Sequence, residues 1–165
     1  LKLFFCFLVL NLSKYLDSDK LSSITNYSVP SYIFDIESQA NERKKVHGTT
    51  IAVGLGFLSS NRRDAVPYIA DKFLRMEGVE VVVSFAIVEG KIVGSVRSSS
   101  NSLALKEFCS SIFGEEYSGV KHYEGGGTVP LGFFSDSTGN VEVDKKFWEV
   151  VEFKLFKKIF DFMDA

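Results

Sequence analysis

The sequence contains little cysteine and little histidine. Its 165 residues include two of each. Cys6 and Cys109 lie far apart and match no metal-binding spacing such as Cys-x-x-Cys, and two cysteines cannot build a disulfide framework. We therefore expect a reducing environment and a cytoplasmic protein.

A strong net charge is also absent. Nineteen Lys and Arg residues stand against 21 Asp and Glu residues, for a net charge of −2. This balance provides no general basic field of the kind that attracts long nucleic acid duplexes. The acidic pairs Asp17/Asp19 and Glu115/Glu116 have no histidine at ligand spacing, so we interpret them as solvated charge rather than as a metal site. A small ligand that needs few charges fits this composition better.

No apolar run has the length of a membrane span. The segment Leu1–Leu12 is interrupted only by Lys2 and Asn11, but a transmembrane helix needs about 20 apolar residues. A signal-peptide core is an alternative, yet polar Ser13–Lys20 follows where a small-residue cleavage site would be expected. We expect no membrane insertion and interpret the run as a buried helix or strand.

Hydrophobic residues are plentiful, at 45% of the chain, and 16 of them are phenylalanines. This content predicts a globular protein with a large aromatic core. The length fits one domain, or one domain with a piece of another attached. Because the first residue is leucine rather than methionine, we expect a fragment or a start that lies upstream.

The sequence predicts strands in three segments. Strict alternation of apolar residues predicts a strand over Thr49–Leu58. A dense β-branched and aromatic run predicts a central strand over Val79–Val88. The dipeptide Glu89-Gly90 then predicts a two-residue turn, with Lys91–Arg97 as the returning strand of a hairpin.

Helical periodicity marks four further segments. Three of them are Ser31–Val46, residues 103–113 and Val143–Met163. The fourth is a helix that follows the cap Ser60-Asn61, with Pro67 in its first turn and Gly78 at its end. We expect Glu115–Gly127 to be a loop and Thr128–Phe134 an edge strand. The order β-α-β-β-α-β-α, after an N-terminal helical segment, predicts an α/β (α+β) fold with a mixed sheet flanked by helices.

The segment Gly119–Gly132 concentrates the polar, ligand-binding chemistry of the chain. It reads Gly-Val-Lys-His-Tyr-Glu-Gly-Gly-Gly-Thr-Val-Pro-Leu-Gly. Three consecutive glycines let a flat or anionic ligand approach backbone N–H groups, and Lys121 and His122 add donors beside them. The alternative is an ordinary surface turn, which glycine and proline also favour.

From about His47 onward the sequence resembles the C-terminal, substrate-binding domain of the DHH phosphoesterase superfamily. That superfamily includes RecJ-type exonucleases, oligoribonucleases and cyclic-dinucleotide phosphodiesterases. The resemblance rests on a loop of the form Gly-Gly-x-His-x-x-Ala/Gly-Ala/Gly-Gly and on a preceding strand that ends in Arg-Ser. The matching residues are Gly119, His122, Gly125, Gly126, Gly127, Arg97 and Ser98, with Val120 in place of the second glycine of the loop.

The resemblance implies a division of the chain and of the enzyme. Residues 1–46 would be the tail of a preceding catalytic domain plus a linker, and residues 47–165 the DHH-associated domain. The Asp-His-His motif is absent, because neither His47 nor His122 has a neighbouring histidine. We therefore expect no cofactor in this chain and no hydrolysis by it alone. Manganese ions in the missing domain would activate water for phosphodiester hydrolysis.

The resemblance also implies a ligand and its contacts. The retained domain would grip the end of a short single-stranded oligonucleotide or a cyclic dinucleotide. The planar guanidinium of Arg97 offers a bidentate fork for a phosphate, and glycine backbone N–H groups can approach the ligand. The predicted binding residues are Arg97, Ser98, Lys121, His122, Gly125, Gly126 and Gly127.

Other interpretations stay open. A non-catalytic nucleotide-binding or dimerisation module could use the aromatic C-terminal helix as an interface, and exposed Leu1–Leu12 would favour a homo-oligomer. The related domain of alanyl-tRNA synthetases fits less well, because no editing-domain zinc motif is present. Polyphosphate is a less attractive substrate, because only Arg97 and Lys121 offer cations for it.

Overall fold

The computed structural model describes residues 28–99, 103–135 and 139–164. The chain divides into two units, 1–31 and 32–165, and the fold described below is that of the second. The predictions made for Leu1–Leu12, and for the residues up to position 27 of the expected catalytic-domain tail, lie outside the described residues. The proposed boundary near residue 46 therefore stays a prediction.

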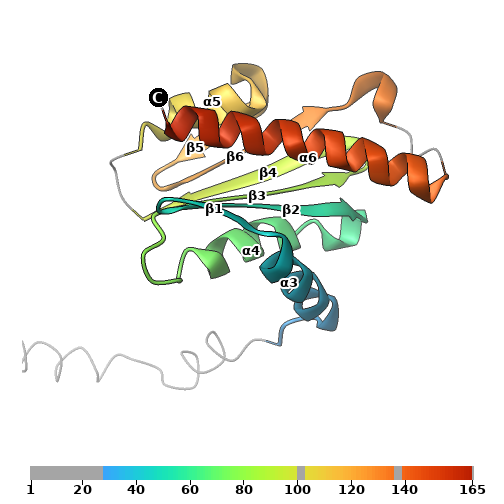
Figure 1. Ribbon diagram of the computed structural model, residues 1–165, viewed down its shortest axis with the longest axis horizontal. Helices are drawn as coiled ribbons and strands as arrows, with labels where there is room; N and C mark the ends of the chain where they lie inside the picture. Colours follow the sequence, from blue (N-terminus) through green and yellow to red (C-terminus); the bar gives the residue numbers. More distant parts are fainter. Residues whose placement is uncertain (1–27, 100–102, 136–138, 165) are drawn as a thin grey trace, which may run out of the picture. The chain divides into compact units, whose positions relative to one another are not determined.

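A six-stranded mixed sheet forms the centre of the unit, in the order β1-β2-β3-β4-β6-β5 (Figure 1). Strands β2 and β3 are parallel, and all other neighbours are antiparallel. The predicted mixed sheet of an α+β fold is thereby confirmed. The strands are β1 (Lys45–His47), β2 (Thr50–Leu58), β3 (Val81–Val88), β4 (Lys91–Ser98), β5 (Ser118–Lys121) and β6 (Glu124–Pro130).

Helices cover both faces of the sheet (Figure 1). On one face α4 packs against β3 and β4, and α3 is tied to α4 by the Lys72 Nζ–Glu37 Oε2 ion pair of 2.6 Å. On the other face lie α5 and α6. The α-helices are α3 (Ser31–Arg43), α4 (Ala65–Phe73), α5 (Leu105–Phe113) and α6 (Val141–Met163), and short 3-10 turns are η1 (Ser60–Arg62), η2 (Glu115–Tyr117) and η3 (Gly132–Phe134).

The central position of strand β3 explains why its sequence contains no charged residue. All eight of its residues are buried, because helices cover both of its faces. Val81, Val83, Phe85 and Ile87 belong to the core beneath α5 and α6. The alternate residues face α4, where the Ser84 hydroxyl donates a 2.6 Å hydrogen bond to the carbonyl of Val66.

Helix α6 begins at a side-chain cap. The Asn140 side-chain oxygen accepts hydrogen bonds from the N–H groups of Glu142, at 3.0 Å, and Val143, at 3.3 Å, which satisfies donors that the helix leaves unpaired.

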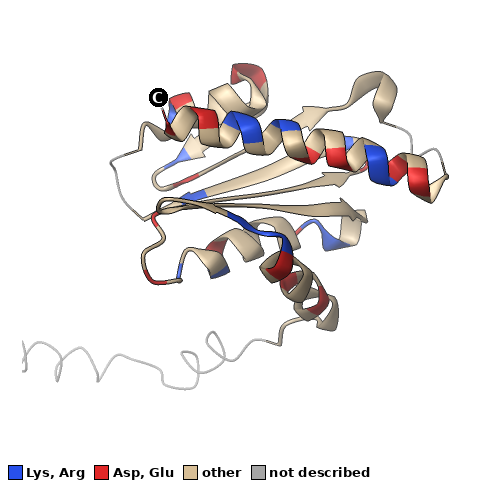
Figure 2. Cartoon of the chain, viewed as in Figure 1, with Lys and Arg blue, Asp and Glu red and all other residues tan. Residues whose placement is uncertain are grey.

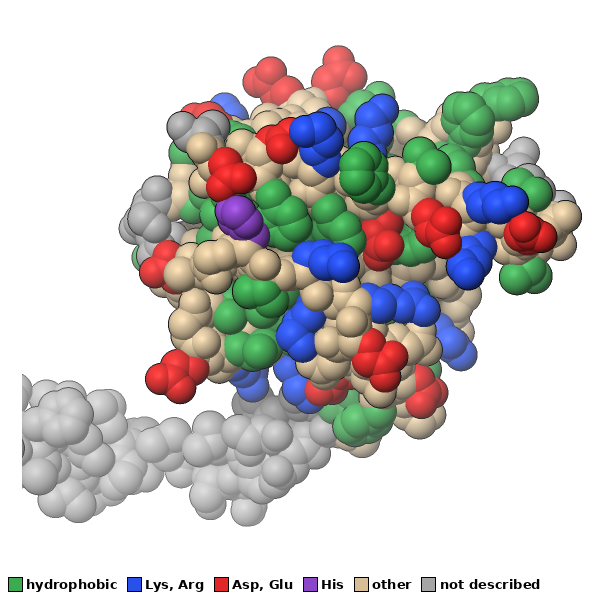
Figure 3. Space-filling view, in the orientation of Figure 1, with side chains coloured by type: hydrophobic (Ala, Val, Ile, Leu, Met, Phe, Trp, Pro, Cys, Tyr) green, Lys and Arg blue, Asp and Glu red, His purple; other side chains and the backbone are tan. Residues whose placement is uncertain are grey.

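Acidic and basic residues are interspersed along the helix (Figure 2). Figure 3 likewise shows hydrophobic side chains among charges of both signs on one face. None of the described helices combines the length and the hydrophobicity needed to cross a bilayer.

Several boundaries differ from the sequence-based predictions, and the helix predicted to end at Gly78 ends at Phe73. The predicted loop Glu115–Gly127 is wrong, because it contains β5 and the first half of β6. The predicted edge strand Thr128–Phe134 is right only for Thr128–Pro130, which end β6 and pair with β4 alone, whereas Gly132–Phe134 form η3. The helix predicted over Ser31–Val46 ends at Arg43, and β1 follows. Glycine carries no side-chain periodicity, so local pattern could not reveal the hairpin.

Candidate functional site

The three consecutive glycines lie in strand β6. Gly125 and Gly127 belong to one face of the sheet, and Gly126 belongs to the other. A Cβ atom on Gly125 would lie 2.5 Å from Cys109 Sγ, and one on Gly127 would lie 2.5 Å from Phe113 Cβ. Helix α5 therefore fills the space beside these two glycines. Gly126 belongs to the opposite face, because successive residues of a strand alternate.

A cleft of about 750 Å³ opens on the face of Gly126, between the start of α4 and strands β4, β5 and β6. Gly119 and Gly126 leave its floor without side chains, and Val66, Pro67 and Tyr117 provide apolar walls. The Arg63 Nη2 group reaches Thr128 Oγ1 at 3.4 Å. The remaining lining comes from Ser60, Asn61, Asp64, Val93, Gly94, Ser95 and Gly127.

A smaller cavity of about 280 Å³ adjoins the cleft, and Gly119 lines both. Its cationic side chains are Arg97 and Lys121, and its carboxylate is Glu124. Val120 and Gly125 complete the lining. The two hollows together offer an apolar region joined to a cationic one, a combination typical of sites for small polar ligands.

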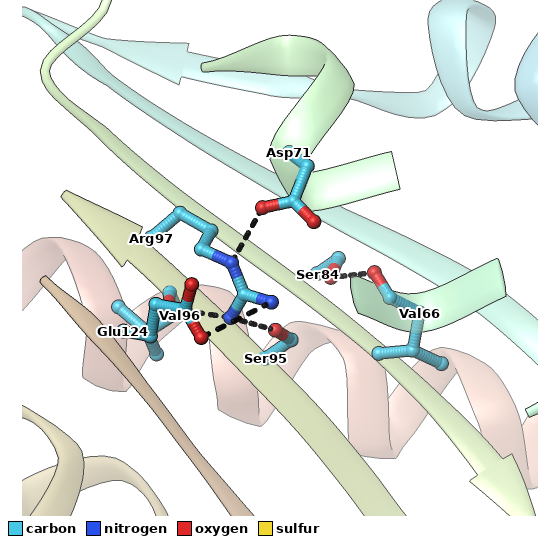
Figure 4. A network of polar contacts seen from close by, with 7 residues as sticks. All are labelled: Val66, Asp71, Ser84, Ser95, Val96, Arg97 and Glu124. Atoms are coloured by element: carbon cyan, nitrogen blue, oxygen red, sulfur yellow. Dashed lines mark hydrogen bonds and ion pairs between the residues drawn. The ribbon is translucent and has the colours of Figure 1, made fainter. Parts of the chain in front are cut away.

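Arg97 lies in a network of polar contacts (Figure 4). Its Nε donates to Asp71 Oδ1 at 2.6 Å, and its Nη1 donates to Ser95 Oγ at 2.8 Å and to the Val96 carbonyl at 3.2 Å. Its Nη2 is 3.9 Å from Glu124 Oε2, which is too long for a hydrogen bond. The side chain is only 13% exposed. The guanidinium is thus held in one orientation before any ligand arrives.

The structure brings five of the seven predicted site residues to these two hollows. Arg97, Lys121 and Gly125 line the smaller cavity, and Gly126 and Gly127 line the larger cleft. No contact in the structure tests their binding roles, which stay predictions.

His122 and Ser98 are placed differently. His122 lies exposed in the two-residue connection between β5 and β6, with a φ of 54°, and lines neither hollow. Ser98 is buried and pairs with Val81 of the core beneath α5 and α6. Its side chain therefore belongs to the face opposite Arg97, and its N–H donates to the Tyr123 carbonyl at 2.9 Å.

The polar wall contributed by η1 and the start of α4 was missed in the sequence. Ser60 and Asn61 were interpreted only as a helix cap, and Arg63 received no role. One signal was present: Arg62 and Arg63 immediately precede a helix, where positive charge opposes the helix dipole.

A metal site is not built by these residues. Within residues 28–99, 103–135 and 139–164, no three Asp, Glu, His or Cys side chains come together as metal ligands. Of the carboxylates near the hollows, Asp71 forms an ion pair with Arg97, and Asp64 accepts a hydrogen bond of 2.7 Å from the Tyr32 hydroxyl. The described residues therefore do not fit manganese.

Cys109 lies behind the glycine strand and is buried. Burial raises the pKa of its thiol to about 11, although a hydrogen bond from the Gly126 backbone opposes this. Because the thiolate is the reactive form, we expect Cys109 to resist a disulfide reagent at pH 8 until the protein unfolds. The measurement is thiol titration of a Cys6→Ser variant with and without denaturant.

The same pKa predicts the sign of a pH effect on stability. The unfolded thiol ionises near its ordinary pKa of 9.0, whereas the folded thiol keeps its proton up to about 11. Stability from this group is therefore complete below pH 9 and falls as the pH rises toward 11. Stoichiometric reaction of the native Cys6→Ser protein within minutes at pH 8 would contradict the burial of Cys109.

Comparisons with known proteins support the fold and leave the activity open. No protein-family model matches the chain. An uncharacterized protein of Methanocaldococcus jannaschii is 28% identical over 149 residues, which are 90% of this chain and 30% of that protein. The chain thus spans about 30% of the length of the curated relative it matches.

The solved structures similar to the chain include the following two. One is an exopolyphosphatase-related protein from Bacteroides fragilis, with 15% identity and a TM-score of 0.54, covering 93% of this chain and 43% of that one. The other is a pGpG-specific phosphodiesterase from Vibrio cholerae, with 10% identity and a TM-score of 0.39, covering 73% and 39%. The first similarity shows a shared fold, and the second is too slight to bear on it.

Proposed function

We propose that the domain of residues 47–165 is the substrate-binding part of a phosphoesterase of the DHH type. It holds the end of a short single-stranded oligonucleotide or a cyclic dinucleotide. A separate domain, carrying the manganese ions that activate water, would hydrolyse the phosphodiester. The chain's resemblance to the DHH-associated domain and its shared fold with an exopolyphosphatase-related protein support this proposal.

The observation that carries the proposal is the cleft on the face of Gly126. Its volume of about 750 Å³ lies within the range of small-molecule sites. A floor without side chains at Gly119 and Gly126 suits a flat nucleobase, and Val66, Pro67 and Tyr117 offer apolar contact to it. The donors of Asn61 and Arg63 can serve a sugar or a phosphate.

The adjoining cavity supplies the phosphate contact. Arg97 is fixed by Asp71 and Ser95, so little of its conformational freedom remains to be lost when a ligand binds. No hydrogen bond from its Nη2 group is found in the described part of the chain, which leaves those N–H donors for a phosphate oxygen. Lys121 adds a second positive charge to the same cavity.

Arg97→Ala is expected to weaken binding of a fluorescent diadenylate by about tenfold to a hundredfold. The reason is the loss of a charge-assisted hydrogen bond, worth about 1.5–3 kcal/mol. Fluorescence anisotropy of the full chain measures the effect. Lys154→Ala removes one positive charge from an exposed position on α6, outside both hollows, and should bind as the wild type does.

Circular dichroism of Arg97→Ala separates lost binding from lost structure. Saturable wild-type binding that survives in a folded Arg97→Ala protein would remove Arg97 from the site. Absence of binding in the wild type would count against the nucleotide proposal and favour the alternative of an assembly module without a ligand.

A further inference from the structure

Glu124 occupies a position between the two cations of the smaller cavity. In the register of the sheet, Glu124 of β6 pairs with Arg97 of β4 on one side and with Lys121 of β5 on the other. The three side chains thus form one row across three strands, on one face of the sheet. Directly opposed residues of antiparallel strands interact, so a carboxylate in this row reduces the attraction of both cations for an anion.

Arg97 itself is largely neutralised. Asp71 takes its Nε donor, and Ser95 and the Val96 carbonyl take donors of Nη1. A phosphate can therefore approach only at Nη2, where Glu124 Oε2 already lies 3.9 Å away. The sequence predicted that the guanidinium of Arg97 would bind a phosphate through two parallel hydrogen bonds. In the structure only its Nη2 group remains for a phosphate, and that group lies beside the negative charge of Glu124.

The charge balance extends over both hollows. Their three cationic side chains are Arg63, Arg97 and Lys121. Two carboxylates line the same hollows, those of Asp64 and Glu124, and a third, Asp71, lines neither hollow but forms an ion pair with Arg97. With Arg97 neutralised by Asp71, the lining has no excess of positive charge and gains little from additional negative charges on its ligand.

We infer that this site selects a ligand end with a single phosphate and rejects polyphosphate, and that Glu124 is the specificity-determining residue. The inference rests on the proposed function and narrows its substrate class. A phosphodiester or a terminal monophosphate presents one phosphate group to Nη2 of Arg97 and is repelled little by the Glu124 carboxylate. A chain of phosphates must place further charges beside Glu124, with only Lys121 left to receive them.

Competition against bound fluorescent diadenylate tests the inference on the full chain. The competitors are unlabelled diadenylate and inorganic tripolyphosphate, and the proteins are the wild type, Glu124→Gln and Glu142→Gln. Glu124 is 64% exposed, so the glutamine variant should fold normally. Glu142 is an exposed glutamate of α6, and its variant makes the same charge change away from the site.

For the wild type we expect tripolyphosphate to compete at least tenfold more weakly than diadenylate. Glu124→Gln should strengthen competition by tripolyphosphate about tenfold, because it removes the repulsion between the Glu124 carboxylate and the added phosphates. A tenfold change in affinity corresponds to about 1.4 kcal/mol. The affinity for diadenylate should change by less than about threefold. Glu142→Gln should behave as the wild type.

The outcomes separate the two claims. If diadenylate binds but tripolyphosphate competes equally well, or if Glu124→Gln leaves the ratio unchanged, the specificity inference is wrong and the binding proposal stands. If neither compound binds the wild type, the proposed function fails and the inference fails with it.

Discussion

Replacing Phe85 by alanine is expected to lower the free energy of unfolding by about 3–5 kcal/mol. Phe85 is 0% exposed and lies on the central strand β3. Its ring centroid is 5.9 Å from that of Trp148 and 5.5 Å from that of Phe156. The substitution removes these aromatic contacts and leaves a cavity between the sheet and α6. Urea unfolding followed by the fluorescence of Trp148, the single tryptophan, measures the loss.

Phe153→Ala is the matched control. Phe153 lies on the same helix as Trp148 and Phe156 but is 70% exposed, so the change should stay within about 0.5 kcal/mol. Should Phe85→Ala not fold at all, Phe85→Leu keeps a buried branched side chain and should lose less than the alanine variant. Equal losses for Phe85→Ala and Phe153→Ala would show that the core is not arranged as described.

Gly127→Val is expected to cost about 1–3 kcal/mol, toward the upper end of that range. Valine is among the residues that strands favour, so a loss must come from packing rather than from propensity. Its Cβ would lie 2.5 Å from both Cβ and Cγ of Phe113. The Cβ of Phe113 cannot rotate away, because it is attached to the backbone of α5. Denaturant unfolding of the variant measures the effect.

Gly119→Val provides the comparison on the neighbouring strand β5. No atom lies within 4 Å of a Cβ at Gly119, and we expect its stability to change by less than about 0.5 kcal/mol. A double variant with Phe113→Ala tests the stated cause, since removing the ring should reduce the cost of valine at position 127. An unchanged stability in Gly127→Val would falsify the close packing of α5 on the glycine strand.

Most of the sheet could be predicted from local sequence. The strand Thr50–Leu58 was visible in its alternating apolar residues, and the hairpin of β3 and β4 in the turn dipeptide Glu89-Gly90. Pro67 in the first turn of α4 was also predicted correctly. These features depend on residues close together in the chain, whose side-chain pattern reports which face is buried.

The candidate site could be predicted only in part. The residue types of Arg97, Lys121 and the glycine triplet predicted one candidate site, and the structure gathers these residues around adjoining hollows. Sequence reasoning treated the triplet as one ligand-binding loop. The structure separates their roles: the absence of a Cβ at Gly125 and Gly127 lets α5 pack against β6, whereas a Cβ at Gly126, which lines the cleft, would meet the Gly94 carbonyl oxygen of β4.

The α+β class, the central strands and the aromatic core could be predicted from the amino-acid sequence, because apolar periodicity and turn residues encode these features locally. Which neighbours each polar residue meets depends on the tertiary structure. The row Arg97–Glu124–Lys121 exists because β6 pairs with β4 and β5 in one particular register. A shift of one residue would turn Glu124 to the face of α5. Such a register depends on packing between distant segments, and a local pattern of three glycines cannot specify it.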